Sequence, residues 1–133
     1  MSKRVLLIDD DEEMCAELRE ILTDEGYEVQ ICLDGHKGRE ALEEGQYEAV
    51  ILDLKLPGLN GYEILKSVRA QGCQAKIIVL SGRPLTANQS LIPQSYAQIQ
   101  EEHILKLADA VMNKPVAVPS LLDKVRSFVL SSP

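Results

Sequence analysis

Residues 49–61 have the sequence AVILDLKLPGLNG. The first four residues are small or aliphatic, a composition typical of a strand that is buried on both faces of a sheet. Asp53 follows this strand directly, and the proline and glycines of residues 57–61 then interrupt regular structure before a helix begins near Tyr62. A buried strand that ends on a carboxylate and continues through a loop into a helix is typical of an α/β protein.

The same alternation of strand and helix extends in both directions from this stretch. We expect five strands, at residues 5–8, 27–33, 49–52, 76–80 and 109–112, and helices at about residues 11–26, 37–44, 62 onward, 94–107 and 119 onward. The strands are separated by helices and no hairpin signal joins them. The pattern therefore predicts an α/β fold, a doubly wound five-stranded parallel sheet with helices on both faces.

The side-chain pattern also indicates which faces pack inward. The alternation in the second strand places four side chains on its inner face, those of Tyr27, Val29, Ile31 and Leu33. In the fourth helix the predicted inner face carries Tyr96, Ile99, His103 and Leu107.

The composition fits a single globular domain. The chain has 133 residues, 45% of them hydrophobic and 26% charged, so we expect one domain over residues 3–130, with residues 131–133 as a tail or the start of a linker. A net charge of −7 argues against direct nucleic-acid binding, which needs clustered Lys and Arg. The apolar runs are too short to span a membrane, and no apolar leader is present, so we expect a cytoplasmic protein. The three cysteines form no CxxC pair and are expected to be free thiols.

The polar residues that matter most stand at the ends of the predicted strands. Asp9 and Asp10 follow the first strand, Asp53 the third, Ser81 the fourth and Lys114 the fifth. In an open α/β sheet, ligands bind beyond the carboxyl ends of the strands. We therefore expect these five side chains to form one site.

Three carboxylates in one site repel each other, by about 4 kcal/mol for two unit charges 4 Å apart at an effective dielectric constant near 20. A cation would relieve this repulsion, and oxygen ligands with room for water suit Mg²⁺. With Mg²⁺ and Lys114 the charges of Asp9, Asp10 and Asp53 are balanced. The balanced site can accept a phosphoryl group, for which a carboxylate is a competent nucleophile.

These features resemble the receiver domains of two-component response regulators. The resemblance covers about residues 4–130 and rests on the pair Asp9-Asp10, the stretch 53–61, Ser81 with a small residue after it, and Lys114 before a proline. It implies the flavodoxin-like strand order 2-1-3-4-5. It also implies a cis peptide bond before Pro115.

The resemblance further implies a role for each site residue. Asp53 would be the phosphoacceptor. Mg²⁺, for which Mn²⁺ can substitute, would be bound by Asp10, Asp53 and the backbone carbonyl of Lys55, with Asp9 acting directly or through water. Ser81 would hydrogen-bond the phosphoryl oxygens and Lys114 would pair with them.

The resemblance implies partners as well. The phosphoryl donor would be a phosphohistidine on a sensor histidine kinase or a histidine phosphotransfer protein, and small phosphodonors could replace it. Phosphorylation would switch contacts with a downstream target, and a homodimer could form through the face made by the fourth helix, fifth strand and fifth helix. Such a domain is not an enzyme, although it assists its own Mg²⁺-dependent phosphorylation and dephosphorylation.

Three features depart from the family pattern. Val111 stands where many relatives carry an aromatic residue that moves during signalling. The connection from Ser81 to Lys114 is about ten residues longer than the family pattern leads us to expect, with the surplus in residues 84–93, although a crossover needs only about a dozen residues. Lys55 and Arg83, two positions after Asp53 and Ser81, occupy places that modulate the lifetime of the phosphoryl group.

Two other functions fit part of the sequence. Phosphatases of the haloacid dehalogenase type use a similar Asp-x-Asp with a later hydroxyl and lysine, but no acidic pair follows Lys114 here. A receiver-like module that binds partners without phosphorylation is favoured by Val111 and the long connection. All five site elements are nevertheless present, which favours the phosphoacceptor.

Overall fold

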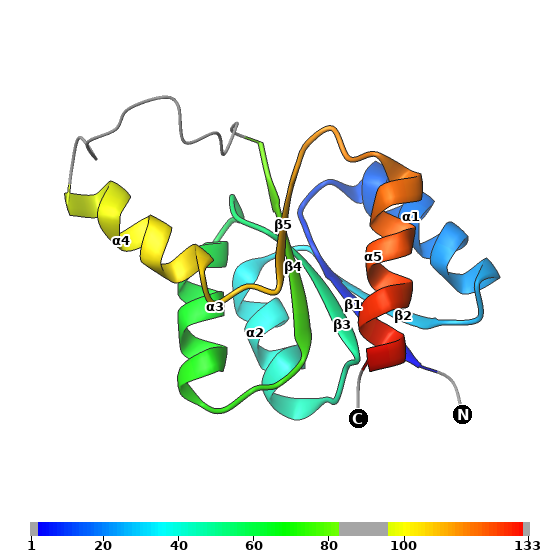
Figure 1. Ribbon diagram of the computed structural model, residues 1–133, viewed down its shortest axis with the longest axis horizontal. Helices are drawn as coiled ribbons and strands as arrows, with labels where there is room; N and C mark the ends of the chain where they lie inside the picture. The colour runs from blue at the N-terminus through cyan, green and yellow to red at the C-terminus, as the bar shows by residue number, and fades with distance from the viewer. Residues whose placement is uncertain (1–2, 83–95, 132–133) are drawn as a thin grey trace.

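The computed structural model describes residues 3–82 and 96–131. Its five strands form one parallel sheet in the order β2-β1-β3-β4-β5 (Figure 1). The strands are β1 Arg4–Ile8, β2 Glu28–Cys32, β3 Ala49–Asp53, β4 Lys76–Ser81 and β5 Ala110–Asn113. The predicted fold and strand order are thereby confirmed.

Five helices cover the two faces of the sheet (Figure 1). They are α1 Glu12–Asp24, α2 Gly35–Glu44, α3 Gly61–Ala70, α4 Tyr96–Leu105 and α5 Val118–Ser131. Helices α1 and α5 pack on one face, and α2 and α3 pack on the other, with α4 beside α3. None of the described helices combines the length and the apolar character needed to cross a bilayer.

Alternation along the central strands divides the core between the two faces. Leu6 and Ile8 of β1 belong to the cluster under α2 and α3, whereas Val5 and Leu7 belong to the cluster under α1 and α5. Every residue of β3 is buried because helices cover both of its faces. This explains the continuous apolar run that precedes Asp53.

Two of the predicted inner faces are partly wrong. Strand β2 ends at Cys32, so Leu33 lies beyond the sheet and is 38% exposed. In the fourth helix Ile99, Leu107 and His103 are exposed instead of buried. The apolar residues of this segment that contact the core are Ile104, Leu105 and Ala108.

Leu107 is exposed because α4 ends at Leu105, so the chain has already turned at residue 107 and the helical spacing no longer holds. Ile99 and His103 lie within α4, and they are exposed because the helix packs on the core through Ile104 and Leu105 instead. The side chain of Tyr96 lies outside the described residues, as do the expected start of the helix at residue 94, the surplus segment 84–93 and the last two residues of the predicted tail.

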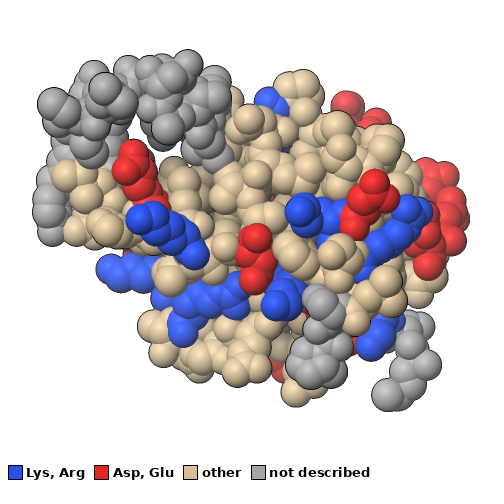
Figure 2. Space-filling model, viewed as in Figure 1, with Lys and Arg blue, Asp and Glu red and all other residues tan. Residues whose placement is uncertain are grey.

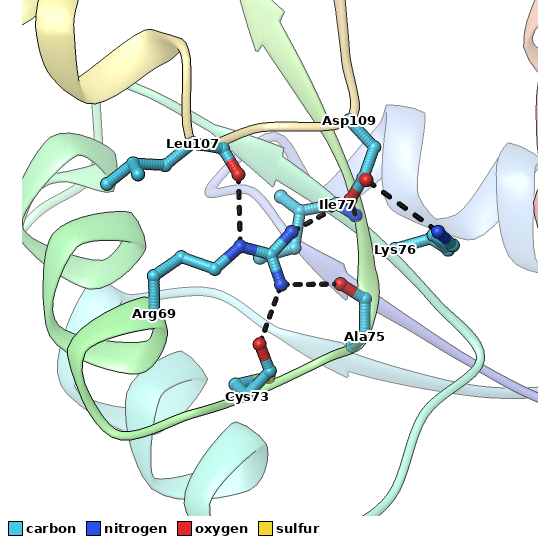
Figure 3. A network of polar contacts seen from close by, with 7 residues as sticks. All are labelled: Arg69, Cys73, Ala75, Lys76, Ile77, Leu107 and Asp109. Carbon is cyan, nitrogen blue, oxygen red and sulfur yellow. Dashed lines mark hydrogen bonds and ion pairs between the residues drawn. The ribbon is translucent and has the colours of Figure 1, made fainter.

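A network centred on Arg69 joins the two connections that precede β4 and β5 (Figure 3). The Arg69 guanidinium donates to Asp109 Oδ2 at 2.8 Å and to three backbone carbonyls, those of Leu107, Cys73 and Ala75. Asp109 Oδ2 also accepts a hydrogen bond from the backbone N–H of Ile77 at 2.8 Å. This set of residues, the Arg69 network, fixes the edge of the sheet where β4 and β5 begin.

Charge is unevenly distributed over the surface. Acidic side chains gather at the right-hand edge of the view in Figure 2, where Figure 1 places α1, whereas Lys and Arg side chains are spread across the face between α4 and α5. Helix α1 contributes Glu12 and Glu13 in its first turn. Acidic residues at a helix N-terminus interact favourably with the helix dipole.

Candidate functional site

Four of the predicted site residues meet at the edge of the sheet where the parallel strands end. Asp9 directly follows β1, Asp53 ends β3, Ser81 ends β4 and Lys114 directly follows β5. The residues Asp9, Asp53 and Ser81 are buried, with 2%, 5% and 3% of their surfaces exposed. Buried polar groups at this position are costly unless they are paired, so the cluster indicates a binding site.

The carboxylates converge as predicted. Oxygens of Asp9, Asp10 and Asp53 lie within 4.8 Å of one another, with Asp10 exposed at the mouth of the cluster. The ammonium of Lys114 lies 2.9 Å from Asp9 Oδ2 and 3.5 Å from Asp53 Oδ1. One lysine therefore contacts two of the three carboxylates.

Asp9 is fixed by the start of α1 and by the sheet. Its Oδ1 accepts a hydrogen bond from the backbone N–H of Asp11 at 3.0 Å, and its own N–H donates to the carbonyl of Cys32. Asp11 in turn caps α1 by accepting from the N–H of Met14 at 3.1 Å. The turn from β1 into α1 thus holds Asp9 inward and leaves Asp10 facing solvent.

Asp53 is fixed by the turn that follows β3. The N–H of Gly61 donates to the carbonyl of Leu54 at 2.9 Å, which closes the loop before α3. A Cβ atom at residue 61 would lie 2.4 Å from the carbonyl oxygen of Asp53, so only glycine allows α3 to begin this close to the acidic cluster. Within the loop, the backbone amide of Lys55 acts on the Asp53 carboxylate and lowers its pKa.

Ser81 and Lys114 are brought together by the pairing of β4 with β5. The N–H of Lys114 donates to the carbonyl of Ser81 at 2.8 Å. Ser81 is one residue past Leu80, which is the neighbour of Asp53 in the sheet. The Lys114–Pro115 peptide bond is cis, which confirms that prediction.

The electrostatics of the cluster favour a bound cation. Burial and the neighbouring charge of Asp9 raise the pKa of Asp53, although Lys114 and the Lys55 amide partly offset this effect. Burial lowers the pKa of Lys114, but its contacts with Asp9 and Asp53 outweigh burial, so the pKa is raised and the lysine stays charged. The three carboxylates exceed the one ammonium, and their oxygen ligands fit a divalent cation.

Of the three residues predicted to modulate the phosphorylated state, the structure describes Lys55 and Val111. Lys55 is exposed in the β3–α3 loop, and Val111 is 37% exposed on β5, while Arg83 lies outside the described residues. A pocket of about 490 Å³ beside the cluster is lined by Asp10 and Lys55 and also by Tyr62 and Glu101, which sequence reasoning missed. No sequence signal identifies Glu101, because only the packing of α4 brings it there.

The family model for the response regulator receiver domain matches residues 5–126 of this chain. The regulatory protein VanRB of Enterococcus faecalis is 33% identical over 132 residues, which cover 99% of this chain and 54% of that protein. The transcriptional regulatory protein DltR of Streptococcus agalactiae is 30% identical over 92% of this chain and 50% of its own length. The chain thus spans about half the length of these relatives.

Solved structures agree with this match. A receiver domain protein from Methanospirillum hungatei is 28% identical with a TM-score of 0.79, and 97% of this chain and 94% of that chain are covered. The response regulator protein TrrA of Thermotoga maritima, solved in complex with Mg(2+)-BeF, is 28% identical with a TM-score of 0.75 over 95% and 98% of the two chains. Because the family match, the strand order and these structures agree along nearly the whole chain, we conclude that it belongs to the receiver domains of two-component response regulators.

Proposed function

We propose that Asp53 is the residue that accepts the phosphoryl group. The observation that carries this proposal is the convergence of Asp9, Asp10, Asp53 and Lys114 at one end of the sheet, with Asp53 buried beside the ammonium. A buried carboxylate with a fixed cation beside it is suited to attack a phosphorus atom, because the ammonium can balance the charge that the phosphoryl group brings.

In the proposed reaction an oxygen of Asp53 attacks the phosphorus of a phosphohistidine. The new oxygen–phosphorus bond forms as the phosphorus–nitrogen bond breaks, and the imidazole leaves with its electron pair. Ser81 would donate a hydrogen bond to one phosphoryl oxygen, and Lys114 would shift part of its pairing from Asp9 to another. The domain would thus assist its own phosphorylation and, with water as the nucleophile, its own dephosphorylation.

Asp9, Asp10, Asp53 and the backbone carbonyl of Lys55 would hold Mg²⁺, and Mn²⁺ could replace it. When bound, the metal ion supplies positive charge that stabilises the phosphoryl oxygens during transfer. The complex of TrrA with Mg(2+)-BeF supports this assignment.

The proposed partners follow from the family. A sensor histidine kinase or a histidine phosphotransfer protein would supply the phosphoryl group, and an unidentified target would respond to it. A homodimer through the α4–β5–α5 face is supported by Ile99 and Val111, each 37% exposed. Lys55, Arg83 and Val111 would modulate the lifetime and output of the phosphorylated state.

The test measures the intact mass of the wild type and of Asp53→Asn after incubation with acetyl phosphate, with and without Mg²⁺. We expect a Mg²⁺-dependent gain of one phosphoryl group that is absent from the variant. If the wild type gains nothing while Mg²⁺ binding is measured separately, and a histidine kinase also fails as donor, the phosphorylation-independent binding module replaces this proposal. Continuous release of inorganic phosphate from many small substrates would instead support a phosphatase.

A further inference from the structure

The loop between β3 and α3, residues 54–60, reaches the phosphoacceptor through its backbone. Its second residue, Lys55, stands two positions after Asp53, and its backbone amide lowers the pKa of the Asp53 carboxylate. The base of the loop is closed by the bond from Gly61 N–H to the Leu54 carbonyl. The position of the rest of the loop therefore decides where the backbone of Lys55 lies relative to Asp53.

The tip of this loop rests on the first turn of α2. The N–H of Gly35 donates to the carbonyl of Pro57 at 3.1 Å. Gly35 is buried, and a Cβ atom there would lie 1.6 Å from the carbonyl oxygen of Leu59 and 2.5 Å from its carbonyl carbon. These are backbone atoms that cannot rotate away, so any larger residue at position 35 must displace the loop.

Two further features fix this contact. Gly58 has φ +81°, and a Cβ atom there would lie 2.9 Å from His36 Cδ2, so the loop tip follows the surface of α2 closely. Asp34 caps α2 by accepting a hydrogen bond from the N–H of Lys37 at 2.9 Å. The cap holds the turn of α2 on which the loop rests.

We propose that Gly35 is a positioning residue for phosphoryl transfer, because it lets α2 hold the loop with the backbone of Lys55 facing Asp53. The inference rests on the proposed function of the site and deepens it. It makes α2, which contributes no side chain to the acidic cluster, a determinant of Mg²⁺ affinity. Groups that orient a ligand without touching the metal commonly change affinity by about 10–100-fold when they are lost.

The test compares Gly35→Ala with Gly38→Ala, the same substitution one turn along the same helix. The three atoms nearest to a Cβ atom at residue 38 would be side-chain atoms of Ile8, the closest at 2.6 Å, so this variant strains the core and leaves the loop in place. Three quantities are measured on each folded protein. They are the Kd for Mg²⁺ by calorimetry, the amide resonance of Lys55 without metal, and the rate of phosphorylation by acetyl phosphate.

We expect Gly35→Ala to weaken Mg²⁺ binding and to slow phosphorylation by about tenfold or more, with a displaced Lys55 resonance. Gly38→Ala should keep the Mg²⁺ Kd within about twofold while its melting temperature falls. Equal losses of affinity in the two variants would overturn the inference, since general destabilisation would then explain both.

A second pair carries the test if Gly35→Ala does not fold. Asp34→Ala removes the cap and loosens the first turn of α2 without a clash, whereas Asp34→Asn keeps a capping oxygen. We expect about threefold weaker Mg²⁺ binding in Asp34→Ala and rescue in Asp34→Asn. A folded Gly35→Ala protein with the Mg²⁺ Kd and the phosphorylation rate of the wild type would overturn the inference about Gly35 but not the proposed function. If Gly35→Ala does not fold, a wild-type Mg²⁺ Kd in Asp34→Ala would overturn it in the same way. A wild-type protein that neither binds Mg²⁺ nor gains a phosphoryl group would overturn the proposed function itself.

Discussion

The ammonium of Lys114 lies closer to Asp9 than to Asp53, at 2.9 Å from one carboxylate and 3.5 Å from the other. The lysine is thus held mainly by Asp9, the carboxylate that follows β1, and it also contacts Asp53. Because the ammonium balances charge on the same carboxylates that would bind a metal ion, lysine and metal compete electrostatically. The lysine also remains available to pair with a phosphoryl oxygen.

We therefore predict opposite effects of Lys114→Met on metal binding and on phosphorylation. Loss of the ammonium should tighten Mg²⁺ binding by about three- to tenfold, because less positive charge opposes the metal. Phosphorylation by acetyl phosphate should slow by about tenfold or more, because the phosphoryl oxygens lose a charged partner. Calorimetry gives the first quantity and intact mass over time gives the second.

Lys66→Met is the control for that experiment, since Lys66 is an exposed lysine on α3 that is not among the site residues. It should change neither quantity. Weaker Mg²⁺ binding in Lys114→Met would contradict the competition and would indicate that the lysine organises the carboxylates instead.

Asp53→Asn is expected to stabilise the metal-free protein. Burial and the charge of Asp9 raise the pKa of Asp53, so the folded state carries an unfavourable charge that asparagine removes. We expect the melting temperature at neutral pH to rise by roughly 4 °C for each 1 kcal/mol gained. Differential scanning calorimetry in a chelating buffer measures the effect.

The pH dependence of this gain has a defined sign. A carboxyl group whose pKa is higher in the folded state binds its proton more tightly there, so its cost is absent below the unfolded-state pKa and grows as the pH rises through the folded-state pKa. The advantage of Asp53→Asn should therefore disappear in acid. Saturating Mg²⁺ should reverse the order at neutral pH, because the metal binds the wild type more tightly. An equal gain at all pH values would point to packing as its source.

Much of this fold could be predicted because its signals are local. The runs that became β1, β3 and β4 are apolar on both faces, and the acidic pair, Asp53, Ser81 and Lys114 each stand at a strand end. Parallel strands bring such ends to one edge of the sheet, so strand positions alone predicted the convergence of Asp9, Asp53 and Lys114 that the structure shows.

The predictions from sequence failed where tertiary packing, and not the local sequence pattern, determines which residues are buried or in contact. The face of α4 that packs on the core carries Ile104 and Leu105, and the turn after Leu105 exposes Leu107 instead of burying it. Glu101 reaches the pocket beside Asp10 only through the placement of α4 against the β3–α3 loop. Likewise, nothing in the sequence indicates that Gly35 meets the backbone of Leu59, because the contact joins segments far apart in the chain.

Val111→Tyr is expected to leave the fold and the phosphorylation rate unchanged. Val111 is 37% exposed on β5, whereas its neighbours Ala110 and Met112 pack against the core under α1 and α5. A ring at residue 111 can point to solvent, so the melting temperature should change by no more than about 2 °C. Met112→Tyr is the matched control and should destabilise the fold by about 1–3 kcal/mol through overpacking. A large loss in Val111→Tyr would mean that this side of β5 has no room for a ring.

The Arg69 network predicts a loss of stability that leaves the acidic cluster unaffected (Figure 3). Arg69 is 17% exposed in its side chain and joins Asp109 with the carbonyls before β4 and β5, so Arg69→Met would leave these acceptors without their shared donor. We expect a cost of roughly 2–4 kcal/mol, measured by urea unfolding. In this variant Asp109 still accepts the hydrogen bond from the N–H of Ile77, which limits the loss of stability.

The Mg²⁺ Kd of folded Arg69→Met should equal that of the wild type, because the network lies where β4 and β5 begin and the cluster lies where the strands end. Arg126→Met is the matched control: Arg126 pairs with Glu25 at an exposed position, where ion pairs contribute little to stability. Stability should therefore fall in Arg69→Met alone. A parallel loss of Mg²⁺ affinity in Arg69→Met would show instead that the two ends of the sheet are coupled through β4 and β5.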